Sequence, residues 1–484
     1  MSLAAKHAKG PTMPEPDISP SIIQGFPPVV AALQQRGLLQ RALHDGLFPA
    51  LMFRAEALRE EWQGQTGTSI TMTRPGLLPP ITTPAVAGRD PDAQQETYEQ
   101  WTAHLQRYNG SIPVHVPTSA HAAISLFVSK VNLLGLQAGQ SLNRLPRNKL
   151  YKTYLSGQTV TIAAALSGDT SIQVASLSGF RDVLTGAGTN IAPAAVSATT
   201  PLSIAITNAP TITRNVIGVQ PLVPDDPDGP GILVLDAALG AAVAARTPVL
   251  AENRPRIIRS GGGNSVDAIG PNDTFVLQDA IAATNWLRRN NVPPHEDGLY
   301  HAHISADGNE QVFTDEVFQR LNTALPDGVR YQEAFIGRIA GLAFFFNNET
   351  PSWDNSGRRT ATGSSAQYSE NIAAETVNEG GVSIARMVVT GRGSIYEQVF
   401  DQANYVTEAG ITGRIGEFNV TYGGMQVSTD DVRVIFRAPQ NKTMDMMDVT
   451  WDITTSFTCP SDVRTGGPQR YKRAVVIEHA MTSG

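Results

Sequence analysis

The sequence predicts a mixed α+β fold that carries a β-rich insertion. Apolar side chains recur at helical spacing from Ser119 to Ser156. They alternate with polar side chains at several places between residues 158 and 255, and they alternate again towards the C-terminus. A chain of 484 residues has room for roughly two to four domains, so these regions can fold around more than one core.

The N-terminal region is expected to be irregular and extended. Six prolines between Gly10 and Pro28 exclude continuous helix or sheet, which predicts an extended arm over residues 1–28. Apolar spacing from Val29 to Trp62 predicts two short amphipathic helices. The stretch that follows is rich in Gly, Pro and Thr and predicts a long extended loop over residues 63–117.

A long helix and a β module are expected next. The helix over Ser119–Ser156 has one apolar face, and Pro146 is expected to bend it. Period-two alternation then predicts strands at 160–162, 172–174 and 202–206. The turn-rich stretch 225–230 is interpreted as the end of these strands, and the outer boundaries of the module are placed at about 158 and 255.

The second half of the chain alternates between the two kinds of element. One helix is expected to begin after Asp273, which would be its N-cap, and to run through Arg289. Two more are expected from Glu310 to Leu321 and from Ser394 to Tyr405. Strands are expected at Tyr300–Ile304, Ile336–Phe346, Val432–Phe436, Val449–Phe457 and Tyr471–Glu478.

Composition excludes several classes of protein. The single cysteine, Cys459, can form no intrachain disulfide and no cysteine-ligated zinc site, which fits folding in the cytoplasm. A net charge of −7 argues against a surface built to grip nucleic acid. The sequence predicts neither a secretory signal nor a membrane span, and only 17% of residues are charged, against roughly 25% in typical soluble domains. Much of the surface is therefore expected to meet partner subunits, or else the fold is rich in loops.

One cluster of potential metal ligands stands out, at His295, Glu296, Asp297, His301 and His303. The two histidines of a His-x-His pair on a strand project to one face, as metal ligands do. The alternative is that they are surface and turn histidines beside a strand. Because no third ligand lies at a convincing spacing, we predict no metal site.

Other chemical motifs are incomplete. Asp225, Asp226 and Asp228 resemble a calcium loop, but neighbouring prolines and the lack of a downstream Glu break the pattern, which favours an acidic turn. The glycine-rich stretch 260–265 lacks the Lys of a phosphate-binding loop. No nucleophile elbow, triad or carboxylate pair can be assembled, so we predict no catalytic residue, no cofactor and no enzymatic activity.

Three segments resemble the phage N4-type major capsid family: Trp286–Pro294, Tyr300–Ile304 and Phe335–Leu342. The first has the family's helix end and proline-containing turn, and the other two match its characteristic strand phrases. Ser305 and Ala306 depart from the family, which usually has His and Pro there. Two later segments also resemble sequences of this family: Val389–Glu397 and Tyr471–Ala480.

The resemblance implies the Hong Kong 97-type, or Johnson, capsid fold. On that basis the chain divides into an N-terminal arm with short helices (1–62), an extended loop (63–117), a spine helix of the peripheral domain (118–157), a β-rich insertion domain (158–255), an axial domain with peripheral-domain elements (256–430) and C-terminal strands of the peripheral domain (431–484).

The same resemblance implies a function. It predicts a major capsid protein that self-assembles, as hexamers and pentamers, into the icosahedral head shell around the double-stranded DNA of a tailed phage. Scaffolding, portal and decoration proteins are candidate partners, DNA is contacted non-specifically at most, and no membrane is involved. The expected location is the virion capsid, assembled in the host cytoplasm. The alternatives are another phage structural protein, such as a tail or decoration protein, or a β-rich hydrolase or carbohydrate-binding protein.

Assembly contacts are expected on the arm and the extended loop. Apolar or aromatic side chains in polar surroundings are the candidates there: Ile22, Phe26, Leu77, Leu78 and Tyr98. The alternative is that these are ordinary loop residues that pack on their own subunit.

Overall fold

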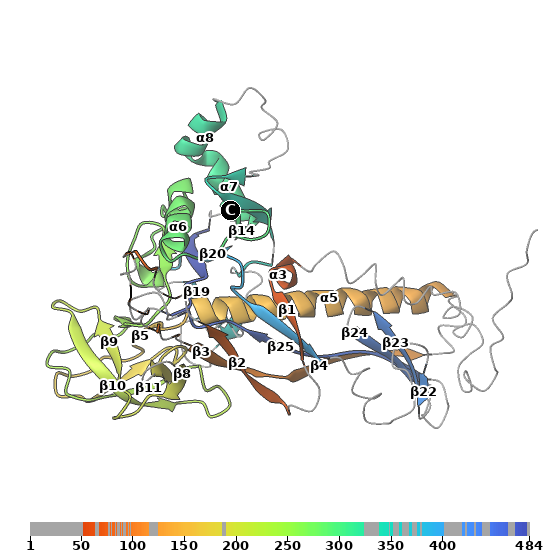
Figure 1. Cartoon of the computed structure of the whole chain (residues 1–484), viewed down its shortest axis with the longest axis horizontal. Coiled ribbons are helices and arrows are strands. Elements are labelled where there is room, and N and C mark those ends of the chain that lie inside the picture. The colour runs from red at the N-terminus through yellow and green to blue at the C-terminus, as the bar shows by residue number, and fades with distance from the viewer. Residues whose placement is uncertain are drawn as a thin grey trace, which may run out of the picture. The chain divides into compact units, whose positions relative to one another are not determined.

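The computed structural model describes residues 52–62, 67–75, 98–115, 124–185, 190–323, 338–347, 349–351, 358–360, 367–369, 375–377, 380–400, 419–421, 424–429, 432–437, 446–462 and 470–481, with single positions and runs of two or three between 78 and 96 (Figure 1). The chain divides into two compact units. The first comprises residues 1–49, 107–139 and 401–454, and the second comprises residues 50–106, 140–400 and 455–484.

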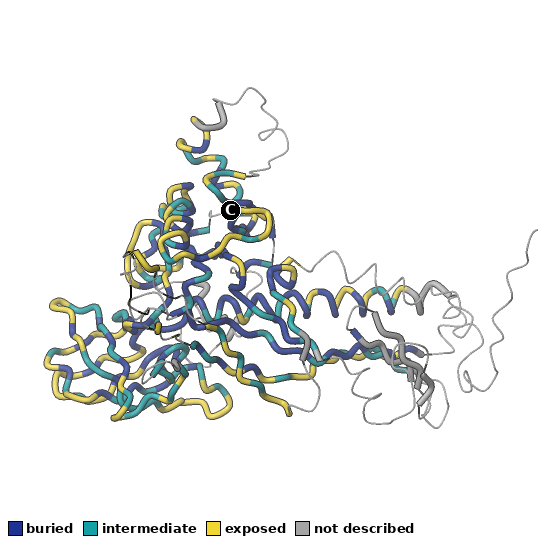
Figure 2. Tube along the Cα trace, in the orientation of Figure 1, coloured by how far each residue is buried: buried dark blue, intermediate teal, exposed yellow. Residues whose placement is uncertain are grey.

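The second unit is built around a six-stranded sheet in the order β13-β26-β20-β14-β16-β15. Its strands are β13 (Ile257–Arg259), β14 (Tyr300–Ile304), β15 (Arg338–Ile339), β16 (Leu342–Phe346), β20 (Ile384–Thr390) and β26 (Ala474–Ala480). Every residue of β20 and β26 is buried, as the dark tube in Figure 2 shows. These strands therefore lack the polar alternation of a half-exposed sheet.

Two hydrophobic clusters explain that burial. Met387, Val389, Val475 and Ile477 pack in one cluster with α6 (Leu277–Arg289). The intervening residues of the same strands pack in a second cluster with the end of α5 and with α3: Val388, Ala474 and Val476. Because successive side chains of a strand point to opposite faces, helices cover both faces of the two central strands.

Helix α5 (Ile124–Tyr154) confirms the predicted long helix. It begins in the first unit and ends in the second, and it continues through Pro146 without interruption (Figure 1). Proline supplies no backbone N–H, so one intrahelical hydrogen bond is missing there, although the helix does not end. At its C-terminal end Tyr151 and Tyr154 are fully buried, and the Tyr154 hydroxyl donates to the Ser394 carbonyl at 3.1 Å.

The strands predicted at 172–174 and 202–206 in the β module are confirmed, whereas the one predicted at 160–162 ends at Val160. β5 (Gln158–Val160), β6 (Ser171–Val174), β9 (Leu202–Ile206), β10 (Ile212–Pro221), β11 (Gly231–Leu235) and β12 (Pro248–Ala251) form one sheet in the order β5-β12-β9-β10-β11-β6. The interpretation of residues 225–230 as the end of these strands is wrong. They connect β10 to β11, which are antiparallel neighbours, so the break in the sequence is a hairpin turn.

Strands also run through the regions expected to be loop and helix near the N-terminus. β2 (Ser69–Pro75) and β3 (Tyr98–His104) form an antiparallel pair inside the predicted extended loop. β3 pairs with β8 (Asn190–Ala195), and β8 pairs with β7 (Asp182–Thr185). Of the predicted helices before residue 62, the structure describes only α3 (Met52–Ala55), and β1 (Leu58–Trp62) is a strand. The arm, residues 1–28, lies outside the described residues.

Several local predictions in the second half are wrong. Leu277 begins α6, and Asp273 does not cap it, because the Asp273 carboxylate accepts from the Gly270 N–H. The Leu277 N–H instead donates to Asp315, which separates α7 (Ala306–Thr314) from α8 (Glu316–Thr323) where one helix was expected. A turn at Ala340 and Gly341, both with positive φ, interrupts the strand expected over 336–346.

The helix expected over Ser394–Tyr405 is also wrong in its described part, where β21 (Tyr396–Phe400) is a strand. β21 lies between β1, which it pairs in parallel, and β25 (Met446–Thr458), which it pairs antiparallel through residues 455–458. Backbone pairing on both sides overrides the local helical spacing. A small sheet of β17 (Arg358–Thr360), β18 (Gln367–Ser369) and β19 (Glu375–Val377) belongs to the same unit.

The sheet that contains β1, β21 and β25 continues with strands of the first unit. β4 (Gln106–His115) pairs with β25, and β25 is followed by β24 (Val432–Arg437), β23 (Gly424–Thr429) and β22 (Asn419–Thr421). The predicted strands at 432–436 and 449–457 are confirmed. Gly110 of β4 lies against Trp451, and a Cβ at this position would come within 2.6 Å of Trp451 Nε1. In the part of the chain that is described, no helix is both apolar enough and long enough to cross a membrane.

We expect Gly179→Ala to destabilise the second unit. Gly179 has φ +80, and a Cβ there would lie 2.3 Å from the backbone nitrogen of Gly157. Left-handed strain and the steric clash together should cost about 2–5 kcal/mol in the free energy of unfolding, measured by urea denaturation. Gly168→Ala is the matched control, because nothing lies within 4 Å of its Cβ position. Equal stability of the two variants would contradict the close approach at Gly179.

Candidate functional site

The structure describes two of the five residues predicted to make assembly contacts. Leu78 is exposed, with 48% of its surface accessible. Tyr98 is half-buried at the start of β3, and its hydroxyl donates to the Glu96 carboxylate at 2.6 Å. Ile22, Phe26 and Leu77 lie outside the described residues, so the predicted assembly contacts stay predictions.

Other exposed apolar side chains were missed by the sequence analysis. Ile81 follows Leu78 in the same segment and is 74% accessible. Leu166 in the β module is 72% accessible, and Phe346 at the end of β16 is 50% accessible. The sequence did carry a signal for the exposure of Ile81, since the two prolines before it disfavour a regular element at this position.

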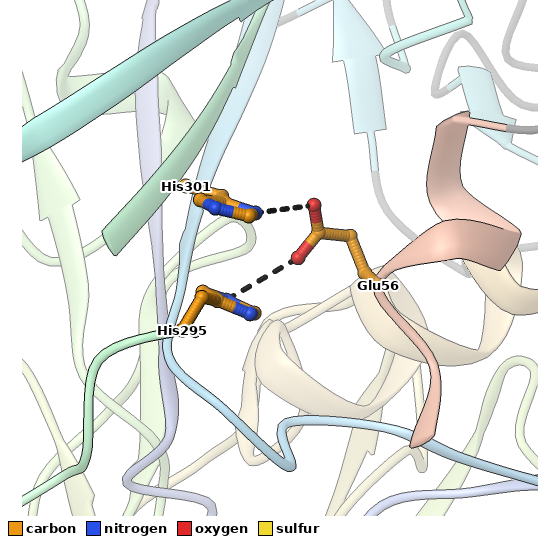
Figure 3. A group of neighbouring side chains, drawn as sticks. All are labelled: Glu56, His295 and His301. Carbon is orange, nitrogen blue, oxygen red and sulfur yellow. Dashed lines mark hydrogen bonds and ion pairs between the residues drawn. The ribbon is translucent and has the colours of Figure 1, made fainter. Parts of the chain in front are cut away.

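The chemically most organised site is a group of histidines around one carboxylate. Glu56 lies between α3 and β1, His295 lies in the turn after α6, and His301 and His303 lie on β14. One oxygen of the Glu56 carboxylate faces the imidazole of His301, and the other faces that of His295 (Figure 3). His301 Nδ1 is 2.8 Å from Glu56 Oε1, and His295 Nε2 is 3.3 Å from Glu56 Oε2.

Further contacts enclose this group. His303 Nε2 lies 3.1 Å from Glu56 Oε1, and the Thr390 hydroxyl donates to Glu56 Oε2 at 3.1 Å. The rings of His295 and His301 stack with their centroids 3.8 Å apart. The second nitrogen of His301, Nε2, is 3.4 Å from Asp297 Oδ2. Glu56 is buried, so this carboxylate obtains its partners from the protein instead of from water.

The surroundings shift the protonation of these groups. Burial by itself would raise the pKa of Glu56, but hydrogen bonds from His301 and His303 and the charges of the histidines lower it far below its usual range. Burial lowers the pKa of His295, although Glu56 acts against this. For His301, burial also lowers the pKa, yet Glu56 and Asp297 outweigh it and the pKa is raised. Glu56 is therefore ionised at neutral pH.

The sequence analysis found part of this site. His295, Asp297, His301 and His303 come together as their spacing suggested. Glu296 does not join them, since it is exposed and pairs with Arg392 at 3.2 Å. Glu56 was missed, because it comes from a distant part of the chain and nothing around it in the sequence distinguishes it from a solvent-exposed glutamate.

A second buried group joins three strands of the central sheet. The Glu478 carboxylate on β26 forms ion pairs with Arg259 on β13 and with Arg386 on β20. In each pair the arginine Nε lies 2.9 Å from a carboxylate oxygen. Burial would raise the pKa of Glu478, but the two guanidinium charges lower it. A charge removed from water is stabilised only when it is paired, so these contacts hold the three strands in one register.

The remaining motifs have structural partners. Asp228 pairs with Lys152 at 2.6 Å and with Arg181 at 3.6 Å, which supports the interpretation of an acidic turn. Gly261, Gly262 and Gly263 all have positive φ and form a turn after β13. Cys459 is buried, and burial raises the pKa of its thiol to about 11, so it is not a reactive thiolate at neutral pH.

The structure of this chain is similar to solved structures of phage capsids. No family model and no curated sequence matches the chain. The capsid of cyanophage P-SCSP1u is 9% identical over 89% of each chain, with a TM-score of 0.45. The capsid of cyanophage Pam1 is 9% identical over 89% of this chain and 90% of that one, with a TM-score of 0.45. The capsid of Ralstonia phage GP4 is 11% identical over 91% of each chain, with a TM-score of 0.41.

His479 gives the second unit a pH-dependent stability. It follows Glu478 on β26, is fully buried beside Phe275, and burial lowers its pKa to about 4. The unfolded chain binds a proton at this residue near its ordinary pKa of about 6.5, whereas the folded chain does so only near 4. The contribution is therefore complete above about pH 6.5 and is lost as the pH falls towards 4.

We expect this loss to be about 3 kcal/mol in the free energy of unfolding between pH 7 and pH 4. Urea denaturation across that range should show a shallower loss for His479→Gln than for the unmodified chain. His104→Gln is the control, because His104 is exposed on β3, and it should leave the profile unchanged. Parallel profiles for His479→Gln and the unmodified chain would contradict the neutral, buried state of His479.

Proposed function

We propose that this chain is a major capsid protein of a tailed bacteriophage, of the N4-type family and the Hong Kong 97-type fold, which self-assembles into the icosahedral head shell. The observation that carries the proposal is where the residues of the family resemblance lie. Segments that are far apart in the sequence meet in one sheet and in the helix that packs on it.

Each resembling segment contributes to that sheet or helix. Trp286–Pro294 ends α6 and forms the turn that leads to β14. Tyr300–Ile304 is β14 itself, which pairs with β16, the strand that follows the turn at Gly341. Val389–Glu397 begins in β20, which pairs with β14, and Tyr471–Ala480 contains β26, which pairs with β20. Matches that arose by chance would not be expected to form one contiguous core.

The order of elements along the chain is a second line of support. A strand pair, β2 and β3, is followed by the long helix α5, the β module and the mixed sheet that β26 completes. This order suits an extended loop, a spine helix, an inserted domain, an axial domain and a peripheral domain. The domain boundaries given from the sequence remain part of the proposal.

The mechanism in this proposal is assembly through many weak contacts. An arm and a loop that lie across neighbouring subunits bury a modest area at each interface, and closed symmetry repeats each contact through the shell. Leu78 and Ile81 in the loop segment expose apolar side chains to water, and burial of these side chains against a neighbouring subunit would be favourable. Hexamers and pentamers of this chain would enclose the DNA without gripping it, given a net charge of −7. The proposal places the chain in the virion, assembled in the host cytoplasm, and assigns it no catalytic role.

The loop can be tested by adding charge. We expect the double variant Leu78→Asp and Ile81→Asp to fold normally and to lose closed shells in negative-stain electron microscopy, because a buried interface excludes an unpaired carboxylate. Leu166→Asp is the matched control, since it places the same charge on another exposed leucine, in the β module. Regular shells from the double variant would remove the loop from the mechanism. Only dispersed subunits from the unmodified chain, expressed alone and with its neighbouring genes, would overturn the capsid proposal.

The arm can be tested by deletion. Removal of residues 1–28 should give folded subunits that no longer close into shells, because the arm is expected to add contacts between subunits and not to complete a core. Circular dichroism checks folding, and electron microscopy checks assembly. Normal shells from the truncated chain would show that the arm is not needed.

A further inference from the structure

We propose that Glu56, His295 and His301 bind a divalent transition-metal ion of the Zn²⁺ class. The expectation of no metal site rested on the lack of a third ligand at a suitable spacing in the sequence. The fold supplies that ligand as Glu56. One donor atom of each of the three residues lies within 4.8 Å of the other two.

The distances suit a single ion. His301 Nδ1 and His295 Nε2 lie 2.8 Å and 3.3 Å from the two oxygens of Glu56. Ligands bound at about 2.1 Å in a tetrahedron lie roughly 3.4 Å apart, which is close to these spacings. The rings of His295 and His301 stack nearly parallel, so at least one ring must rotate before both lone pairs point at the ion. Two imidazoles and one carboxylate are a common zinc ligand set, and imidazole also suits copper, nickel and iron.

Asp297 orients one ligand as the second sphere of a metal site does. If Nδ1 of His301 binds the metal, its ring proton must sit on Nε2, which lies 3.4 Å from Asp297 Oδ2. A carboxylate that accepts the distal proton of a metal-binding histidine fixes the tautomer and strengthens the ligand.

The position of the ring proton on His303 decides the fourth ligand. His303 Nε2 lies 3.1 Å from Glu56 Oε1. Nδ1 of His303 faces the amide nitrogen of Asn347 at 3.4 Å, and this amide can only donate. Because Nδ1 accepts from this amide, the ring proton of neutral His303 sits on Nε2, so His303 donates to Glu56 and a solvent molecule completes four-coordination.

The site would have a structural role. Glu56 belongs to the segment of α3 and β1, whereas His295 and His301 flank the start of β14. An ion held by all three would join the N-terminal segment of the second unit to its central sheet. Because these distant residues form no site in the unfolded chain, the free energy of metal binding would add to the stability of the folded state.

The alternative is a metal-free cluster in which the imidazoles donate to Glu56. Direct metal binding by the full-length chain separates the two. The chain is stripped with EDTA, dialysed into chelator-free buffer near pH 7.5, and titrated with ZnCl₂ by calorimetry. We expect one equivalent of Zn²⁺ to bind. Titration with CoCl₂ should give the intense visible absorption of a four-coordinate ion and not the weak bands of hydrated Co²⁺.

Variants identify the ligands. Glu56→Gln and His301→Asn should each weaken Zn²⁺ binding by at least about 100-fold, and Asp297→Asn by about 10- to 100-fold because it removes only the orienting carboxylate. His104→Asn is the matched control, since it removes an exposed histidine elsewhere in the same unit, and it should leave the affinity unchanged. Circular dichroism confirms that each variant is folded.

The outcomes are decisive in both directions. Loss of the equivalent in Glu56→Gln with retention in His104→Asn supports the site. No binding by the folded, unmodified chain overturns it, and so does binding that Glu56→Gln and Asp297→Asn leave unchanged. The result is independent of the capsid proposal, because binding is measured on the chain whether or not it assembles.

Discussion

The burial of β20 and β26 on both faces is the constraint on which the second unit depends. Helix α6 covers one face, and α5 with α3 covers the other, so alternate residues of each strand enter different cores. No position on these strands is left for a solvated side chain. A shift of one residue in the register of either strand would exchange the residues that enter the two cores, and the core against α6 would then receive Arg386 or Glu478 in place of an apolar side chain.

The charged residues inside this sheet follow from the same constraint. Arg386 and Glu478 occupy directly opposed positions on the two central strands, and Arg259 on β13 completes the group. An unpaired charge there would cost several kcal/mol, whereas the paired group is stable only when all three strands are in place. The apolar residues provide most of the driving force, and the ionic group specifies one arrangement of the strands.

The sequence predicted those elements whose pattern is local. β14 and β25 were predicted because their alternation is visible within a few residues, and α5 because its apolar face is long. β20 was missed because Arg386 interrupts an apolar run, and only the fold shows that Glu478 neutralises it. β21 was taken for a helix because its partners β1 and β25 lie far away in the chain. His301 and His303 were found from their spacing, but Glu56 has no local signal and could be identified only from three-dimensional proximity.

The position of Glu56 shows how the N-terminal segment is held. α3 has only four residues and cannot be a stable helix alone, so its docking depends on tertiary contacts. Phe53 packs against Tyr151 and His303, Arg54 pairs with the buried Glu397, and Glu56 enters the histidine group. Three successive contacts of different kinds thus fix a very short segment. Since the Glu56 carboxylate meets both β14 and the turn before it, whatever neutralises its charge affects how firmly this segment is joined to the central sheet.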